Sequence, residues 1–333
     1  MEGIKLALGC PIRDDYLRFA KRMGLEYVQT NAPIFENQEY WTYDELARMV
    51  DKADSFGLKI LSVENTPAQF YDKLLWGLPG KERQLDHYRT CIENVGRVGI
   101  PIMGYHFMPT SVWRDVDRAM VHGDVAFTAY HHQTIDRDGP QPHNLCDPSL
   151  VGAPEEKLWE NYEYFIKGIL PTAAQANVKL AMHPDDPPVR EINGVKRLFY
   201  SVEQFKKAWE LVEGHPNWGL DFCMGSISEL DGAASVGEFI DFFAPKGAIC
   251  YCHFRDVSGC MCSPEQGFHE TFLGEGNYDP AEMLLRLHRQ GFAGHLIDDH
   301  VGAIPDDPGN FQAHAQAIGY MQGLVRMADY LNK

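Results

Sequence analysis

Short apolar runs alternate with segments of helical periodicity along most of the chain. The apolar runs are rich in branched and aromatic residues, as expected for strands, and span 4–9, 26–30, 58–64, 101–107, 178–184, 218–223, 249–256 and 294–300. The helical segments span 14–24, 42–57, 81–99, 154–177, 201–213, 234–246, 279–291 and 311–332. This repeat predicts an α/β fold, a (β/α)8 TIM barrel formed as a single domain by residues 1–333. A doubly wound sheet is the main alternative, but no G-x-G-x-x-G follows the first run.

Several predicted helices begin at residues that favour helix initiation. Thr42, Ser201 and Asp279 stand at predicted N-termini, where their side-chain oxygens are able to accept hydrogen bonds from the first turn. Pro280 suits a first helical position, because it has no amide hydrogen that would need a partner there. These residues support the predicted boundaries.

Residues 109–153 interrupt the strand and helix alternation. The segment is too long for a simple connection and mixes aromatic residues, histidines and turn residues. It follows the fourth strand, on the side of a barrel where active sites form. We therefore predict a lid-like insertion, with a surface insertion that has no functional role as the alternative.

The composition argues against some partners. Of the 333 residues 44% are hydrophobic, and 30 basic residues against 47 acidic ones give a formal net charge of −17. No dense run of lysine and arginine is present, so we expect no nucleic-acid partner. The start of the chain lacks a signal-peptide pattern, and no apolar run is long enough to cross a bilayer. We expect a cytoplasmic protein that has no membrane partner and forms a homo-oligomer.

The eight cysteines do not require a disulfide framework, because the chain is long and carries no secretion signal. We expect most of them to be free thiols. The two C-x-C pairs between Cys250 and Cys262 superficially resemble a zinc cluster, but structural zinc pairs usually have a wider spacing.

Metal-ligand and acid/base side chains stand at the ends of five strand-like runs. They are Glu64, His183, Cys223, His253, and the adjacent Asp299 and His300. Because the carboxyl ends of barrel strands meet at one mouth, this placement predicts a metal-dependent enzyme. Asp185 and Asp186 are alternative ligands, although their position before two prolines favours a role in fixing the loop.

Seven segments in one order resemble the mannonate dehydratase family. They are SVENTP at 62–67, YHFMP at 105–109, LAMHPDDPP at 180–188, DFCMGS at 221–226, HFRDV at 253–257, FHETFLGEGNYD at 268–279 and DDH at 298–300. The resemblance implies a metal-dependent hydro-lyase that converts D-mannonate to 2-keto-3-deoxy-D-gluconate. It also implies a divalent metal, Mn²⁺ first and Fe²⁺ second, bound by His183, Cys223, His253 and Asp299. Imidazole, thiolate and carboxylate together suit such a transition metal better than magnesium or calcium.

The same resemblance makes His300 the candidate proton carrier, since it corresponds to the histidine of the family's D-H pair. The family also has a tyrosine ahead of the last helix, where this chain has Phe311, and Tyr130 is our candidate for its replacement. His106, Asp256 and Asp298 are further departures from the family pattern. We expect substrate contacts from residues near the strand ends, namely Glu64, Asn65, His106, Arg197 and Arg255.

Three functions remain open from the sequence. The first is a sugar-acid dehydratase, and the second is a metal-dependent isomerase or epimerase of the xylose-isomerase-like superfamily acting on an uncharged sugar. The third is a non-catalytic protein that binds a metal or a sugar, which the presence of a proton carrier disfavours. In each case the partner is a small molecule.

Overall fold

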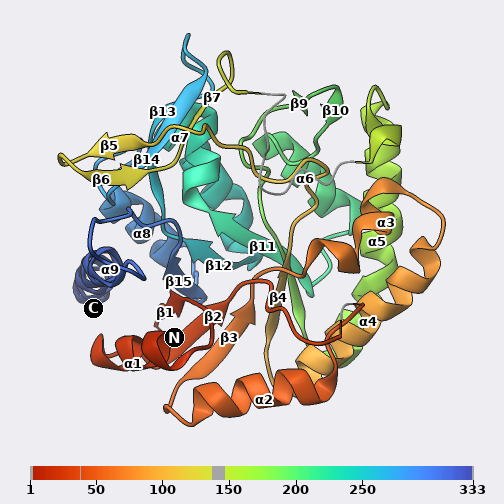
Figure 1. The fold of residues 1–333 in the computed structure, drawn as a ribbon, viewed down its shortest axis with the longest axis horizontal. Coiled ribbons are helices and arrows are strands. Elements are labelled where there is room, and N and C mark those ends of the chain that lie inside the picture. The colour runs from red at the N-terminus through yellow and green to blue at the C-terminus, as the bar shows by residue number, and fades with distance from the viewer. Residues whose placement is uncertain (1–2, 38, 137–146, 332–333) are drawn as a thin grey trace.

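Eight parallel strands close into a barrel in the computed structural model, which describes residues 3–37, 39–136 and 147–331 (Figure 1). The barrel strands follow one another in chain order, and the first pairs with the last. They are β1 (Lys5–Gly9), β2 (Tyr27–Thr30), β3 (Lys59–Val63), β4 (Ile102–Tyr105), β8 (Lys179–Met182), β11 (Trp218–Cys223), β12 (Ile249–His253) and β15 (His295–Asp298). The predicted TIM barrel is therefore confirmed.

The helices surround this barrel (Figure 1). They are α1 (Asp14–Arg22), α2 (Tyr43–Asp54), α3 (Asp72–Trp76), α4 (Lys81–Arg97), α5 (Glu155–Ala176), α6 (Val202–Leu211), α7 (Met224–Phe243), α8 (Pro280–Arg289) and α9 (Phe311–Leu331). Short 3-10 turns occupy Ala68–Phe70, Pro148–Leu150 and Ala244–Lys246. In the part of the chain that the structure describes, no helix combines the length and apolar character needed to cross a membrane.

Two of the three predicted helix caps are present. Thr42 forms a reciprocal capping box with Glu45, and the Asp279 carboxylate accepts two amide hydrogen bonds at the start of α8. Ser201 makes no side-chain capping bond, so that prediction was wrong. Its backbone is extended, and α6 begins at the next residue without side-chain assistance.

Helix α7 begins earlier than its periodicity predicted. We expected a helix over 234–246, whereas α7 starts directly after β11 and is broken by non-helical backbone that includes Gly232. The Cys223 side chain acts as the cap, because its sulfur lies 3.5 Å from the amide nitrogen of Ser226. The small residues of this first part carry little amphipathic signal, which is why the helix start was missed.

The insertion after β4 contributes strands of its own. Described parts of 109–153 form a hairpin of β5 (Ala119–Val121) and β6 (Val125–Phe127), followed by β7 (Ala129–His131). Strand β7 pairs with β14 (Gly267–Thr271), which pairs with β13 (Asp256–Cys260), so the insertion and the β12–α8 connection share a three-stranded sheet. A further small hairpin, β9 (Glu191–Ile192) with β10 (Val195–Lys196), lies in the connection after β8. The lid role remains a prediction, and residues 137–146 lie outside the described residues.

Most described cysteines are free, as predicted. Cys10, Cys91, Cys223, Cys250 and Cys252 are buried free thiols. The exception is a disulfide between Cys260 and Cys262, which closes the end of β13. Cys146 lies outside the described residues.

Gly104 on β4 has no room for a side chain. A Cβ added there would stand 1.8 Å from the Glu64 carbonyl oxygen and 2.6 Å from the Tyr251 hydroxyl. We predict that Gly104→Ala lowers the free energy of unfolding in urea by about 3 kcal/mol, because rigid backbone must shift. Gly319→Ala is the control: Gly319 is helical and has open space around it, so the free energy of unfolding should rise by about 0.5–1 kcal/mol. If Gly104→Ala left the free energy of unfolding unchanged, the close packing around Gly104 would be contradicted.

Candidate metal centre and active site

The four predicted metal ligands lie together at the carboxyl end of the barrel. Ligand atoms of His183, Cys223 and His253 all lie within 4.8 Å of one another, and all three residues are buried. Asp299 follows β15, and its Oδ2 lies 3.5 Å from His253 Nδ1 and 4.0 Å from Cys223 Sγ. The strands β8, β11, β12 and β15 are neighbours in the barrel, so their ends meet.

Each histidine has an oxygen atom close to the ring nitrogen that faces away from the cluster. His183 Nδ1 lies 2.6 Å from the Pro184 carbonyl oxygen, which only accepts, so Nδ1 carries the hydrogen and Nε2 keeps its lone pair. His253 Nε2 lies 3.2 Å from Asp221 Oδ1 and 3.6 Å from Glu64 Oε2. These nearby carboxylates favour a hydrogen on Nε2 and leave the lone pair of Nδ1, on the side of Asp299, as the candidate metal ligand.

The surroundings of Cys223 favour its thiolate. Burial alone raises the pKa of a thiol, because it disfavours the charged form. At Cys223 the positive charge of the Arg255 guanidinium and the neighbouring rings of His183 and His253 outweigh burial and hold its pKa well below the usual value. Since the thiolate is the form that binds metals, the site supplies its sulfur ligand in the required state.

The surroundings of His253 favour positive charge. Burial lowers its pKa, but Asp221, Asp299 and Glu64 raise it well above the ordinary value. Three carboxylates and a thiolate thus stabilise a cation at this position, and neither ring nitrogen of His253 has a conventional hydrogen-bond partner among the described residues. The donor set fits a divalent transition metal.

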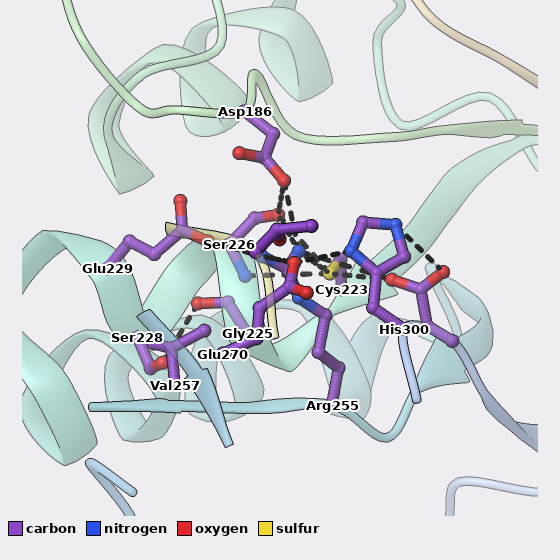
Figure 2. Close-up of polar contacts among 12 residues, drawn as sticks. Asp186, Cys223, Gly225, Ser226, Ser228, Glu229, Arg255, Val257, Glu270 and His300 are labelled. Carbon is purple, nitrogen blue, oxygen red and sulfur yellow. Dashed lines mark hydrogen bonds and ion pairs between the residues drawn. The ribbon is translucent and has the colours of Figure 1, made fainter. Parts of the chain in front are cut away.

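Arg255 connects several charged residues next to Cys223 (Figure 2). Its guanidinium pairs with Asp186 at 3.0 Å and with Glu229 at 2.7 Å. It also lies 3.0 Å from Glu270 and 3.5 Å from Cys223 Sγ. The side chain is 1% exposed, so its donors serve protein groups and not the opening of the site.

A second arginine, which the sequence did not single out, reaches this network from the insertion. Arg114 donates to both carboxylate oxygens of Asp186, at 2.5 and 2.6 Å, and lies 3.2 Å from Glu270. Asp186 therefore accepts from two guanidiniums, which hold its pKa well below the usual range despite burial. The predicted loop-fixing role of this residue agrees with these contacts.

His300 lies at the edge of the same network (Figure 2). Its Nδ1 bonds to Glu270, and its Nε2 lies 3.7 Å from Asp299 Oδ1. The side chain is 41% exposed, in contrast to the buried candidate ligands. Burial lowers the pKa of His300, but the carboxylates of Asp299 and Glu270 raise it above its ordinary value. The geometry suits an imidazole that is anchored at Nδ1 and exchanges a proton at Nε2.

Three predicted substrate residues lie on the other side of the cluster. Glu64 accepts hydrogen bonds from Gln29 and Asn31, each at 3.0 Å. Asn65 Nδ2 lies 3.2 Å from Asn31 Oδ1, while its own Oδ1 is buried and has no partner among the described residues. The ring of His106 packs on a candidate ligand ring at 4.5 Å between centroids, and its buried Nε2 also lacks a partner there.

Arg197 and Tyr130 lie in packed surroundings. Arg197 is fully buried and donates to Thr110 at 3.1 Å and to the Asp186 carbonyl oxygen at 3.2 Å, contacts that fix the loop after β8. The Tyr130 hydroxyl lies 2.7 Å from His132 Nδ1. The Tyr130 ring is buried in the apolar cluster that β7 and β14 share. The structure thus gives both residues protein partners, and their roles toward the substrate remain predictions.

The departures from the family pattern have local partners. Asp298 is buried and lies 2.6 Å from Nδ1 of His314 on α9. Asp256 accepts amide hydrogen bonds from the loop after β14 at 3.0–3.1 Å. Phe311 packs against aromatic rings of α1 at 5.0–5.1 Å between centroids. These side chains bind or pack against neighbouring elements, and none of them is part of the cluster.

Comparison with known proteins agrees with this geometry. The family model for D-mannonate dehydratase matches residues 19–146 and 151–333. Mannonate dehydratase of Thermotoga maritima is 27% identical, over 89% of this chain and 88% of its own length. The enzyme of the same name from Lactococcus lactis subsp. cremoris is 28% identical, over 86% and 87%.

Solved structures show the same fold. The crystal structure of mannonate dehydratase from Streptococcus suis matches with a TM-score of 0.86 at 25% identity, covering 100% of this chain and 95% of that one. An L-ribulose 3-epimerase matches with a TM-score of 0.62 at 14% identity, covering 99% and 97%. At 14% identity, the similarity to the epimerase shows a shared fold and nothing more.

Asp221 provides a test of the orientation of His253. We predict that Asp221→Asn weakens Mn²⁺ binding by about 10–100-fold, because the charged acceptor that holds the ring is lost. The measurement is calorimetric titration of metal into the metal-free protein. Tyr251→Phe is the matched control, because the Tyr251 hydroxyl donates to the other Asp221 oxygen at 2.9 Å and leaves the contact with His253 intact. If Asp221→Asn and the parent protein bound Mn²⁺ with equal affinity, Asp221 would have no role in metal binding.

Proposed function

The chain belongs to the D-mannonate dehydratase family, and we propose that it removes water from D-mannonate at the cluster of His183, Cys223, His253 and Asp299. The product is 2-keto-3-deoxy-D-gluconate. The observation that carries the proposal is the convergence of four mixed donors from adjacent strand ends beside an exposed histidine. This arrangement combines the two requirements of the reaction, a cation for the acid substrate and a group that transfers protons.

The metal in this proposal is a divalent transition ion, Mn²⁺ in preference to Fe²⁺. His183 Nε2, Cys223 Sγ, His253 Nδ1 and the Asp299 carboxylate hold it, since these atoms face one another and their other contacts fix their protonation. When bound, such an ion supplies a Lewis acid that stabilises negative charge on a substrate carboxylate. Glu64 and Asp221 orient His253 in this arrangement.

The proton chemistry falls to His300. Dehydration breaks the C2–H bond and the C3–O bond and releases the C3 hydroxyl as water, and the resulting enol becomes the 2-keto acid. His300 Nε2 is the atom that exchanges a proton with the substrate, because Nδ1 is engaged by Glu270. Glu270 is in turn held by Arg114 and Arg255, so the imidazole is fixed in direction.

The substrate hydroxyls lie against the uncharged side of the cluster. Asn65 Oδ1 and His106 Nε2 are buried polar atoms without described partners, and hydroxyl groups satisfy both. The two buried arginines act through other residues: Arg255 holds the Cys223 thiolate, and Arg197 holds the loop after β8. We therefore propose no direct contact between either arginine and the carboxylate of the substrate.

Incubation of the purified Mn²⁺-loaded protein with D-mannonate tests the reaction. We expect a 2-keto-3-deoxy acid, measured as its semicarbazone, and we expect the activity to disappear after chelation and to return with Mn²⁺. A parallel panel of aldoses and ketoses tests the isomerase alternative. Formation of a ketose from an aldose, without any keto acid from D-mannonate, would replace the dehydratase assignment.

A pair of variants separates proton transfer from metal binding. His300→Asn should lower kcat by about 10²-fold or more, the usual contribution of general acid–base catalysis, with metal content near the parent value. Asp299→Asn should lose both activity and metal, because its carboxylate is a ligand in this proposal. Steady-state kinetics and elemental analysis give the two readouts. Normal turnover in His300→Asn would exclude this histidine from the reaction, and loss of its metal would make it a ligand.

A further inference from the structure

A cavity of about 360 Å³ opens beside the cluster, between the loops that follow β2, β3 and β4. Its outer wall is largely apolar and includes Tyr71, Leu75 and Trp76 from the region of α3, together with Met108 after β4. The size falls in the range of pockets that enclose a whole small ligand. D-mannonate that is held by its carboxylate places only three carbons beyond the reacting positions, so it leaves much of this cavity unfilled.

The cavity is continuous with the proposed active site. Asn31 and Asn65 line it and also hydrogen-bond to the Glu64 carboxylate, at 3.0 and 3.3 Å. His106 lines it too and packs on the ring of His183. A substrate anchored at the cluster therefore extends directly into this space.

Three buried polar atoms in residues that line the cavity lack hydrogen-bond partners among the described residues. They are Asn65 Oδ1, His106 Nε2 and Trp76 Nε1. Buried polar groups are normally satisfied. Asn65 Oδ1 and His106 Nε2 are assigned above to hydroxyls of D-mannonate, which leaves Trp76 Nε1 as a donor for a hydroxyl or ether oxygen of a larger ligand. An apolar wall with a small number of polar groups is typical of a small-molecule site.

The charges of the lining residues limit the kind of ligand that the cavity can bind. Among its described lining residues there is neither lysine nor arginine, and Asp72 is acidic. An anionic group there would be desolvated without a cation, which is costly. A longer open-chain polyol would match the outer wall less well than a sugar ring, because its C–H groups do not form one continuous apolar face.

We propose that this cavity is a subsite for an uncharged sugar ring attached to the distal end of the substrate, so that the enzyme also dehydrates 6-O-glycosylated D-mannonate. A pyranose has apolar C–H faces and a rim of hydroxyls, which matches the wall described above. The chemistry at C2 and C3 is unchanged, and the glycosidic bond is neither formed nor broken. This inference rests on the proposed dehydratase function and extends its substrates to glycosylated forms of D-mannonate.

The test uses the Mn²⁺-loaded full chain and three acids: D-mannonate, the acid obtained by oxidising the reducing end of 1,6-linked mannobiose, and D-mannonate 6-phosphate. Calorimetry on the slow His300→Asn variant gives Kd, and the parent protein gives kcat/KM. We expect the glycosylated acid to bind about tenfold more tightly than D-mannonate, because its ring buries apolar surface. We expect the phosphate to bind at least tenfold more weakly.

A variant that fills the cavity provides the matched comparison. Ala68 lines the cavity and is partly exposed, so Ala68→Trp should abolish the tenfold preference for the glycosylated acid. Ala174→Trp is the control, since Ala174 is exposed in the last turns of α5, at the opposite end of the barrel, and should keep the preference.

The outcomes distinguish the two proposals. Turnover of D-mannonate together with weaker binding of the glycosylated acid would overturn the subsite and leave the dehydratase function intact. A preference that survives Ala68→Trp would also overturn it. If no acid is turned over, the dehydratase function fails, while tight binding that Ala68→Trp removes would still support the subsite.

Discussion

Burial of a guanidinium is unfavourable unless carboxylates surround it, and this constraint organises the mouth of the barrel around Arg255. Its partners come from separate connections: Asp186 follows β8, Glu229 lies on α7, and Glu270 lies on β14. One side chain thus fixes three connections relative to the Cys223 sulfur. The position of the candidate ligands depends on this charge balance as much as on the strands that carry them.

The barrel and the chemically active residues at its strand ends were accessible from the sequence, because parallel strands bring their carboxyl ends together, and the resemblance to the dehydratase family singled out four of these residues as candidate ligands. Asp221 was also accessible, since it precedes Cys223 by two residues on one strand and so shares its face. Arg114 and Glu270 were not. Their contacts join segments 72 and 156 residues apart, and no periodicity or spacing in a single sequence reports such a pair.

The departures from the family pattern show how the barrel tolerates change near its site. Asp298 places an acid in the wall of the barrel, and His314 on α9 supplies the matching imidazole. Asp256 likewise satisfies a turn of backbone amides. In both cases a buried carboxylate is paired locally, so the ligands one or a few residues away keep their surroundings. The changed residues are visible in the sequence, but the groups that bind them are not. These groups are either distant in the chain or part of the backbone, and no sequence pattern identifies them.

The pairing of β7 with β14 has a mechanical consequence. The insertion is hydrogen-bonded to the strand that carries Glu270, and Arg114 ties it to the same carboxylate. Any outward displacement of this three-stranded sheet therefore withdraws the anchor of His300 at the same time. The imidazole of His300 and the insertion are thus mechanically coupled through Glu270, so a movement of the insertion away from the barrel would also change the direction in which His300 Nε2 points.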